Sequence, residues 1–294
     1  MKKITILDGG MGREIKKRLH NFDPILWSAS ALLNHQKIVK DIHKEFLNAG
    51  STIITTNNYT VVPYVLKSKN IFNQFEKLTN IAGNCAREAI IESRITNSKV
   101  AGCLPPLKLT YRPDLIEENN ATAYQTYTNI INWLDPYVDL YLAESLTSII
   151  ELNQILEATK HRSKPLYVSF ILDDANPKQL LDKTSISELI PLVNNSHIKA
   201  FLFNCCQPKT VTEGLDELTN LTVEYGAYAN AFKSLNNIFN HGDFREISND
   251  INIEYYINSV KDWLSKGATI VGGCCGIGPD YIHEIKNLVT SQLN

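Results

Sequence analysis

The chain reads Ala268-Thr269-Ile270-Val271-Gly272-Gly273-Cys274-Cys275-Gly276 near its carboxyl end, an apolar run that stops at two cysteines set between glycines. A second cysteine pair, Cys205-Cys206, ends a similar run, Phe201-Leu202-Phe203-Asn204. The pattern indicates two separate strands that each deliver thiols at their carboxyl ends. In a closed parallel barrel those ends share one mouth, where active sites are built.

Strand-like runs alternate with amphipathic, helix-like stretches along the whole chain, which is typical of a parallel sheet with helical crossovers. The first and last predicted strands both end in glycine-rich turns, and barrel closure would place these turns side by side. We therefore predict a single-domain α/β fold over residues 1–294, a (β/α)8 TIM barrel, rather than an open doubly wound sheet. The predicted strands are residues 4–7, 52–56, 99–103, 140–144, 166–171, 200–204, 222–229 and 269–271.

Composition narrows the class of protein. The 294 residues carry a formal net charge of −2, which gives no sign of a nucleic-acid or anionic-membrane partner. No apolar run approaches the ~20 residues of a membrane span, and the amino terminus does not read as a signal peptide. Six cysteines in so long a chain do not resemble a disulfide scaffold. We expect a cytoplasmic protein whose clustered cysteines bind metal or act in catalysis.

The cysteines point to a soft metal, most simply zinc. Neighbours in a regular strand face opposite ways, but Gly272, Gly273 and Gly276 permit backbone angles that aim Cys274 and Cys275 at one point. A thiol from the Cys205-Cys206 pair would make three thiolates and leave the fourth position of a tetrahedral zinc open. Alternatively, that pair is a set of small buried hydrophobes, as we expect for Cys85. Cys103 ends a predicted strand, so it either borders the mouth or, as we favour, is a core residue.

An open position beside three thiolates suits a thiol substrate. Zinc deprotonates a coordinating thiol at neutral pH, whereas a free thiol with a pKa of about 8.5 is mostly protonated. Such a site would generate a sulfur nucleophile able to attack an electrophilic carbon.

The chain resembles the homocysteine S-methyltransferase family along essentially its whole length. The resemblance is carried by Asp8-Gly9-Gly10-Met11-Gly12, Leu26-Trp27-Ser28-Ala29, His43 to Gly50, Ile54-Thr55-Thr56-Asn57, Glu144, Asn204-Cys205 and Gly273-Cys274-Cys275-Gly276. It implies a barrel that holds one Zn²⁺ through Cys205, Cys274 and Cys275, with homocysteine sulfur as the fourth ligand. In the family the ligand directly follows asparagine, which selects Cys205 over Cys206.

The resemblance further implies that homocysteine attacks a methyl group on a sulfonium donor and becomes methionine. The bare barrel with Leu26-Trp27-Ser28-Ala29 looks more like users of S-methylmethionine or S-adenosylmethionine than of betaine. Residues 101–106 differ from the best-known single-domain enzymes, so another donor, or a different thiol or selenol acceptor, stays open. A non-enzymatic zinc- or thiol-binding barrel is the alternative of another class. The sequence gives no view of the oligomeric state.

Substrate contacts are expected at the ends of the strands. Asp8, Gly9 and Gly10 would let the backbone approach the amino-acid end of the ligand, with free N–H groups for its carboxylate. Glu144 would be costly to bury alone and would pair with the ammonium, unless a barrel-mouth Lys or Arg takes that place. Trp27 offers a ring to the cationic sulfonium, unless it only packs. Thr56 and Asn57 could hydrogen-bond at the mouth.

Overall fold

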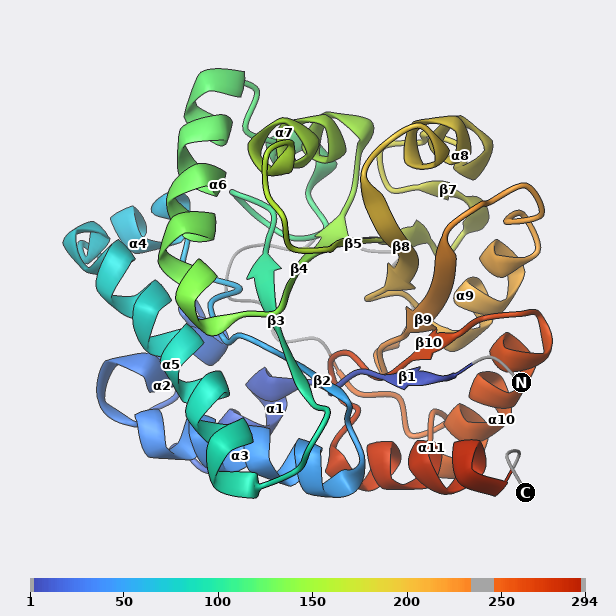
Figure 1. Cartoon of the computed structure of the whole chain (residues 1–294), viewed down its shortest axis with the longest axis horizontal. Coiled ribbons are helices and arrows are strands. Elements are labelled where there is room, and N and C mark those ends of the chain that lie inside the picture. Colours follow the sequence, from blue (N-terminus) through green and yellow to red (C-terminus); the bar gives the residue numbers. More distant parts are fainter. Residues whose placement is uncertain (1–2, 234–245, 292–294) are drawn as a thin grey trace.

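The computed structural model describes residues 3–233 and 246–291. Within them, eight parallel strands run around the centre of the molecule and helices lie outside (Figure 1). These strands are β1 (Thr5–Ile6), β2 (Ile53–Thr55), β3 (Lys99–Leu104), β4 (Leu140–Leu146), β5 (Leu166–Phe170), β8 (Ile198–Asn204), β9 (Glu224–Tyr228) and β10 (Ile270–Val271). Their order is β1-β10-β9-β8-β5-β4-β3-β2.

A single bridge closes the ring. Leu7, directly after β1, pairs in parallel with Ile53 of β2. The N–H of Thr52 also donates to the carbonyl of Ile6 at 2.7 Å. The predicted barrel is therefore confirmed, and β10 lies beside β1 as closure requires.

Helices follow the strands on the outside of the barrel (Figure 1). They are α1 (Met11–Lys16), α2 (Ser30–Asn34), α3 (Gln36–Ala49), α4 (Pro63–Ser68), α5 (Phe75–Ser93), α6 (Asn120–Leu134), α7 (Ile149–Thr159), α8 (Ile186–Asn194), α9 (Pro208–Leu215), α10 (Ile253–Ser265) and α11 (Pro279–Ser291). Gly267, just beyond α10, has φ +95°, the left-handed conformation that glycine adopts readily after a helix. None of the helices in the described ranges combines the length and apolar character needed to cross a membrane.

One antiparallel hairpin was not expected from the sequence. It consists of β6 (Leu172–Asp173) and β7 (Asn176–Leu180) and follows β5. Helix α7 begins after Ser148, whose side chain accepts from the N–H of Glu151, whereas Ser145 belongs to β4.

The core has two layers. Inside the barrel, apolar side chains from the strands fill the centre, including Leu7, Leu142, Leu202 and Ile270. A larger layer lies between the strands and the helices. Because strands buried on both faces are apolar throughout, they read in the sequence as continuous runs rather than as alternating ones.

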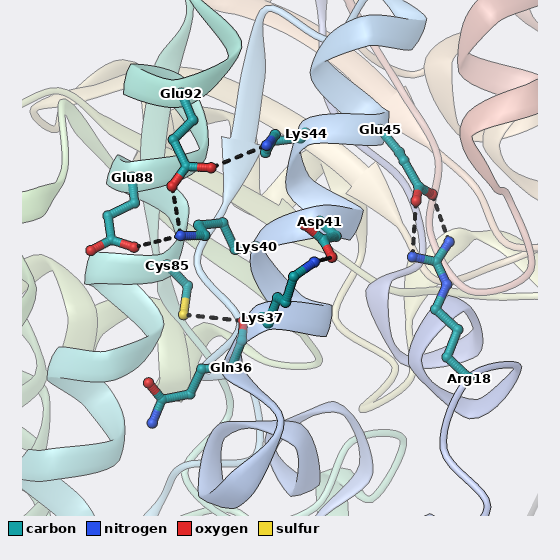
Figure 2. A network of polar contacts seen from close by, with 10 residues as sticks. All are labelled: Arg18, Gln36, Lys37, Lys40, Asp41, Lys44, Glu45, Cys85, Glu88 and Glu92. Carbon is teal, nitrogen blue, oxygen red and sulfur yellow. Dashed lines mark hydrogen bonds and ion pairs between the residues drawn. The ribbon is translucent and has the colours of Figure 1, made fainter.

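On the outer surface, α3 and α5 are joined by ion pairs. Lys40 of α3 lies between Glu88 and Glu92 of α5, with Nζ–Oε distances of 3.1 and 2.6 Å, and Lys44 also reaches Glu92 (Figure 2). These side chains all remain partly accessible to solvent, so the ion pairs contribute little to stability.

Candidate active site

A cavity of about 260 Å³ opens at the carboxyl ends of the barrel strands. Its wall comes from segments that lie far apart in the sequence, because strands β1, β2, β4, β8 and β10 all end there. The structure brings every predicted site residue to this wall: Asp8, Gly9, Gly10, Trp27, Thr56, Asn57, Glu144, Cys205, Cys274 and Cys275.

Three thiols converge in the cavity. The sulfur of Cys205, after β8, lies 2.6 Å from that of Cys274, after β10, and the side chain of Cys275 interacts with both. Contact with the Cys205 thiol, then with that of Cys275, raises the pKa of Cys274 well above its usual range. Cys206 is different: it is fully buried and is not part of the wall.

The backbone around Cys205 is unusual and tightly held. Cys205 has φ +55° and Ser145 has φ +63°, a left-handed conformation that costs a non-glycine residue roughly 1–2 kcal/mol. The amide of Asn204 accepts from the N–H of Ser145 and donates to its hydroxyl, which in turn donates to the sulfur of Cys205 at 3.4 Å. Ser169 also donates to Asn204. This network compensates the strain and fixes the direction of the thiol.

The glycines of the two turns work differently from our expectation. Only Gly276 of the cysteine turn is left-handed, with φ +89°. Gly273 is required by space, since a Cβ there would lie 2.2 Å from the side chain of Ile277. A Cβ on Gly10 would lie 2.7 Å from the carbonyl oxygen of Cys274. Close packing of the two turns, more than free choice of angles, therefore aims the thiols.

One expected role of the first turn is wrong in part. The N–H of Gly10 donates to the carbonyl of Ile277 at 2.9 Å, so this group is already used and does not wait for a substrate carboxylate. The N–H of Gly273 likewise donates to the carbonyl of Asp8 at 3.0 Å. These bonds tie the ends of β1 and β10 together.

The donor set fits a soft metal ion, after a small adjustment. No group of three His, Cys, Asp or Glu side chains in the described ranges is already spaced for a metal. Two thiolates on one tetrahedral zinc lie roughly 3.8 Å apart, from zinc–sulfur distances of about 2.3 Å, whereas the sulfurs of Cys205 and Cys274 lie 2.6 Å apart. Three thiols in one cavity repel one another once ionised, and a cation between them would remove that repulsion.

Two carboxyls face the same cavity, the buried Asp8 and the partly buried Glu144. Asp8 accepts from the N–H of Thr55 at 2.8 Å and from its hydroxyl at 3.2 Å. Burial raises the pKa of Asp8 to about 7, and the nearby Glu144 adds to this effect. Burial likewise raises the pKa of Glu144 to about 7, with a further contribution from Cys205. A cationic ligand would stabilise both carboxylates.

The remaining predicted contacts differ in what they can offer. The hydroxyl of Thr56 donates to Asn58 and accepts from the N–H of Cys103, so it supports the wall of the cavity. Asn57 donates its amide to the carbonyl of Ser28, and its Oδ1 has no hydrogen-bond partner within the described part of the chain. The guanidinium of Arg13 lies over the ring of Trp27, 5.7 Å from its centroid, so this ring already makes a cation–π contact within the protein.

Several wall residues were missed in the sequence. Four further aromatic side chains line the cavity: Tyr59, Tyr111, Tyr228 and Phe232. Tyr111 has φ +63° and donates its hydroxyl to the carbonyl of Cys205 at 3.1 Å, across 94 residues of sequence. The only sequence signal for Tyr228 was its place at a strand end, and Tyr111 lies in a connection without any periodic pattern.

Comparisons with known proteins agree with this geometry. A family model described as homocysteine S-methyltransferase matches residues 5–289. The chain is 24% identical to the homocysteine S-methyltransferase of Escherichia coli strain K12, over 96% of this chain and 94% of that protein. It is 25% identical to homocysteine S-methyltransferase 2 of Saccharomyces cerevisiae, over 98% and 94%.

A selenocysteine methyltransferase of Astragalus bisulcatus is 23% identical, over 98% of this chain and 93% of that protein. Among solved structures, the metallated form of the homocysteine methyltransferase MmuM from Escherichia coli superposes with a TM-score of 0.82, 23% identity and coverage of 98% and 96%. At this identity the superposition supports the fold alone.

Proposed function

This chain belongs to the homocysteine S-methyltransferase family, and on that premise we propose that it methylates the thiol of homocysteine with a sulfonium donor, giving methionine. The donor would be S-methylmethionine or S-adenosylmethionine. The whole chain, residues 1–294, would form one homocysteine-binding barrel domain. The observation that carries the proposal is the meeting of three thiols and two carboxyls in one cavity.

In this proposal Cys205, Cys274 and Cys275 hold a zinc ion. When bound, the zinc supplies the charge that keeps the acceptor thiol deprotonated near neutral pH. Support comes from the all-thiol donor set and from the relief of thiol repulsion that a cation would bring. The network of Ser145 and Asn204 keeps Cys205 in place for this role.

Asp8 and Glu144 would bind the ammonium group of homocysteine. Asp8 is buried and Glu144 is partly buried, and each has a pKa of about 7 in the empty cavity. An ammonium between them would return both to their ionised forms and would fix the amino-acid end of the acceptor. Fixing that end orients the acceptor sulfur toward the donor, which makes the reaction effectively unimolecular.

The aromatic wall suits a cationic methyl donor. Trp27, Tyr59, Tyr111 and Phe232 present rings to the cavity, and such rings attract sulfonium or quaternary ammonium groups. The Oδ1 of Asn57 can accept from a donor that carries an N–H group, which both proposed sulfonium donors have and betaine lacks. A cavity of about 260 Å³ lies just below the ~300–1,000 Å³ typical of drug-sized ligands, which favours the compact S-methylmethionine.

The reaction needs little help from acids. Transfer breaks the bond between the methyl carbon and the donor sulfur and forms a bond between that carbon and the acceptor sulfur. The donor leaves as a neutral thioether, and the proton of the acceptor thiol goes to solvent. Because the leaving group is neutral and stable, we propose no general acid.

A turnover screen tests the proposal. Homocysteine is incubated with S-methylmethionine, S-adenosylmethionine or betaine, methionine is measured, and the zinc content is determined on the same sample. We expect the highest kcat/KM with S-methylmethionine and about one zinc per chain. Binding of homocysteine without turnover on any donor would identify a non-enzymatic thiol-binding barrel. A higher kcat/KM for selenocysteine than for homocysteine would indicate that selenocysteine is the preferred acceptor, as the name of the Astragalus relative says of that protein.

A further inference from the structure

We infer that Cys103 is a positioning residue for acceptor recognition, whose thiol holds the carboxylate of Glu144 toward the cavity. The inference rests on the proposed function for the identity of the acceptor. From its sequence, Cys103 was expected to be a core residue, and indeed it is fully buried and lies outside the cavity wall. Its role would therefore be exerted entirely through Glu144.

The position of Cys103 is fixed by its backbone. It lies on β3, beside Leu142 of the neighbouring β4. Its N–H donates to the hydroxyl of Thr56 at 2.9 Å, and its carbonyl accepts from the amide of Asn58 at 3.0 Å. Because both backbone groups are held, the thiol has a defined place from which to donate.

The thiol donates directly to the carboxylate. The distance from Sγ of Cys103 to Oε1 of Glu144 is 3.1 Å, within the range of a sulfur hydrogen bond. The other oxygen, Oε2, accepts from the hydroxyl of Tyr228 on β9 at 3.4 Å. One donor on each oxygen, from opposite sides of β4, sets the plane of the carboxylate, as Thr55 does for Asp8.

A thiol has a particular advantage at this place. It is a weak, neutral donor, and burial next to Glu144 raises its pKa well above the usual range, so it stays protonated. A lysine or arginine here would neutralise Glu144 and compete with the ammonium of the acceptor. Within the described residues, the other titratable groups that interact with Glu144 are Asp8, Tyr59, Cys205 and Tyr228, none of them cationic.

If Cys103 orients Glu144, its loss should weaken the binding of the acceptor and leave methyl transfer largely intact. The two variants Cys103→Ala and Cys103→Ser have nearly the same side-chain volume and differ in the hydroxyl donor. Comparing them separates the hydrogen bond from the small cavity that both changes create. Cys85→Ala and Cys85→Ser repeat the same changes at a buried cysteine of α5, whose sulfur contacts the carbonyl of Gln36 at 3.8 Å (Figure 2).

The kinetic experiment measures kcat and both KM values. Losing one hydrogen bond to a charged group should raise the KM for homocysteine about tenfold in Cys103→Ala. The kcat, the KM for the donor and the zinc content should stay within about twofold. Cys103→Ser should recover most of the affinity for homocysteine, and the Cys85 variants should keep the wild-type KM.

A second readout does not depend on homocysteine. Carbon-13 NMR of glutamate-labelled, ligand-free protein, with Glu144→Gln for assignment, follows the titration of Glu144. Its pKa should rise in Cys103→Ala, since a donor to the charged form is lost, and fall again in Cys103→Ser. If wild-type protein neither binds nor methylates homocysteine, the proposed function is wrong, and this titration alone decides on Cys103.

Three results would overturn the inference. The first is an unchanged titration of Glu144 in Cys103→Ala. The second, in an enzyme that does turn over, is equal KM values for homocysteine in Cys103→Ala and Cys103→Ser. The third is an equal rise in KM caused by Cys85→Ala, which would indicate a general loss of packing.

Discussion

Replacing Glu144 by glutamine should make the empty, metal-free protein more stable at alkaline pH. Burial raises the pKa of Glu144 from 4.5 to about 7. The folded protein therefore keeps a proton that the unfolded chain has lost, and stability falls as the pH rises from about 4.5 to about 7. Glutamine is uncharged and has the shape of the protonated acid, so this loss disappears in the variant.

The size of the effect follows from the two pKa values. At about 1.4 kcal/mol for each pH unit between them, the cost of Glu144 is about 1 kcal/mol at pH 5 and about 3 kcal/mol at pH 8. Urea denaturation of zinc-stripped wild type and Glu144→Gln at both pH values measures this difference. We expect the variant to gain about 2 kcal/mol more at pH 8 than at pH 5, while it loses affinity for homocysteine.

Glu88→Gln serves as the control, because it is expected to change stability in the opposite direction. Hydrogen bonds from Asn84 and then from Lys40 lower the pKa of Glu88, so its charge stabilises the fold slightly above the unfolded pKa. Figure 2 shows the contact with Lys40. Its replacement should cause a small loss at pH 8 and less at low pH. An equal stability gain for Glu144→Gln at pH 5 and pH 8 would refute the reasoning, since the gain would then not arise from ionisation.

Three further changes test other parts of the molecule. Cys274→Ser or Cys275→Ser should abolish zinc binding and methyl transfer together, and full turnover by a zinc-free variant would contradict the proposed role of these thiols. Gly12→Ala would place a Cβ 2.1 Å from Nε1 of Trp27, so the ring must move and the KM for the donor should rise about tenfold, with the KM for homocysteine as the internal reference. His43 is fully buried, both its ring nitrogens lack partners within the described ranges, and burial lowers its pKa from 6.5 to about 3. As the pH falls, His43 binds a proton in the unfolded chain but stays neutral in the folded protein. His43 should therefore lower the free energy of unfolding by about 2 kcal/mol as the pH falls from 7 to 5. Urea denaturation should show this loss in wild type and not in His43→Leu.

The barrel could be predicted because its strands are buried on both faces. Such strands read as short apolar runs, and their regular alternation with amphipathic helices leaves few topologies. The β6–β7 hairpin could not be predicted in this way, since Leu180 is the one residue of β7 that is buried. Its pairing depends on the contact with Leu172, which no local pattern encodes.

The wall of the cavity was predictable where residues lie at or close to the carboxyl end of a strand, as Asp8, Glu144 and Cys205 do. The topology of a parallel barrel gathers these positions at one mouth whatever the details of packing. Two features were out of reach. Tyr111 arrives from a long connection without periodicity, and Cys103 looks like any small core residue until its distance to Glu144 is known.

The neighbourhood of β1 and β10 has a consequence for how the molecule matures. Cys274 and Cys275 follow β10, and β10 docks beside β1, which lies far earlier in the sequence. A growing chain that has passed Cys205 holds one thiol of the three and an unclosed sheet. If the proposed site holds a metal, its three thiols come together only after the barrel has closed, so the energy of metal binding would add to that of folding for closed barrels alone.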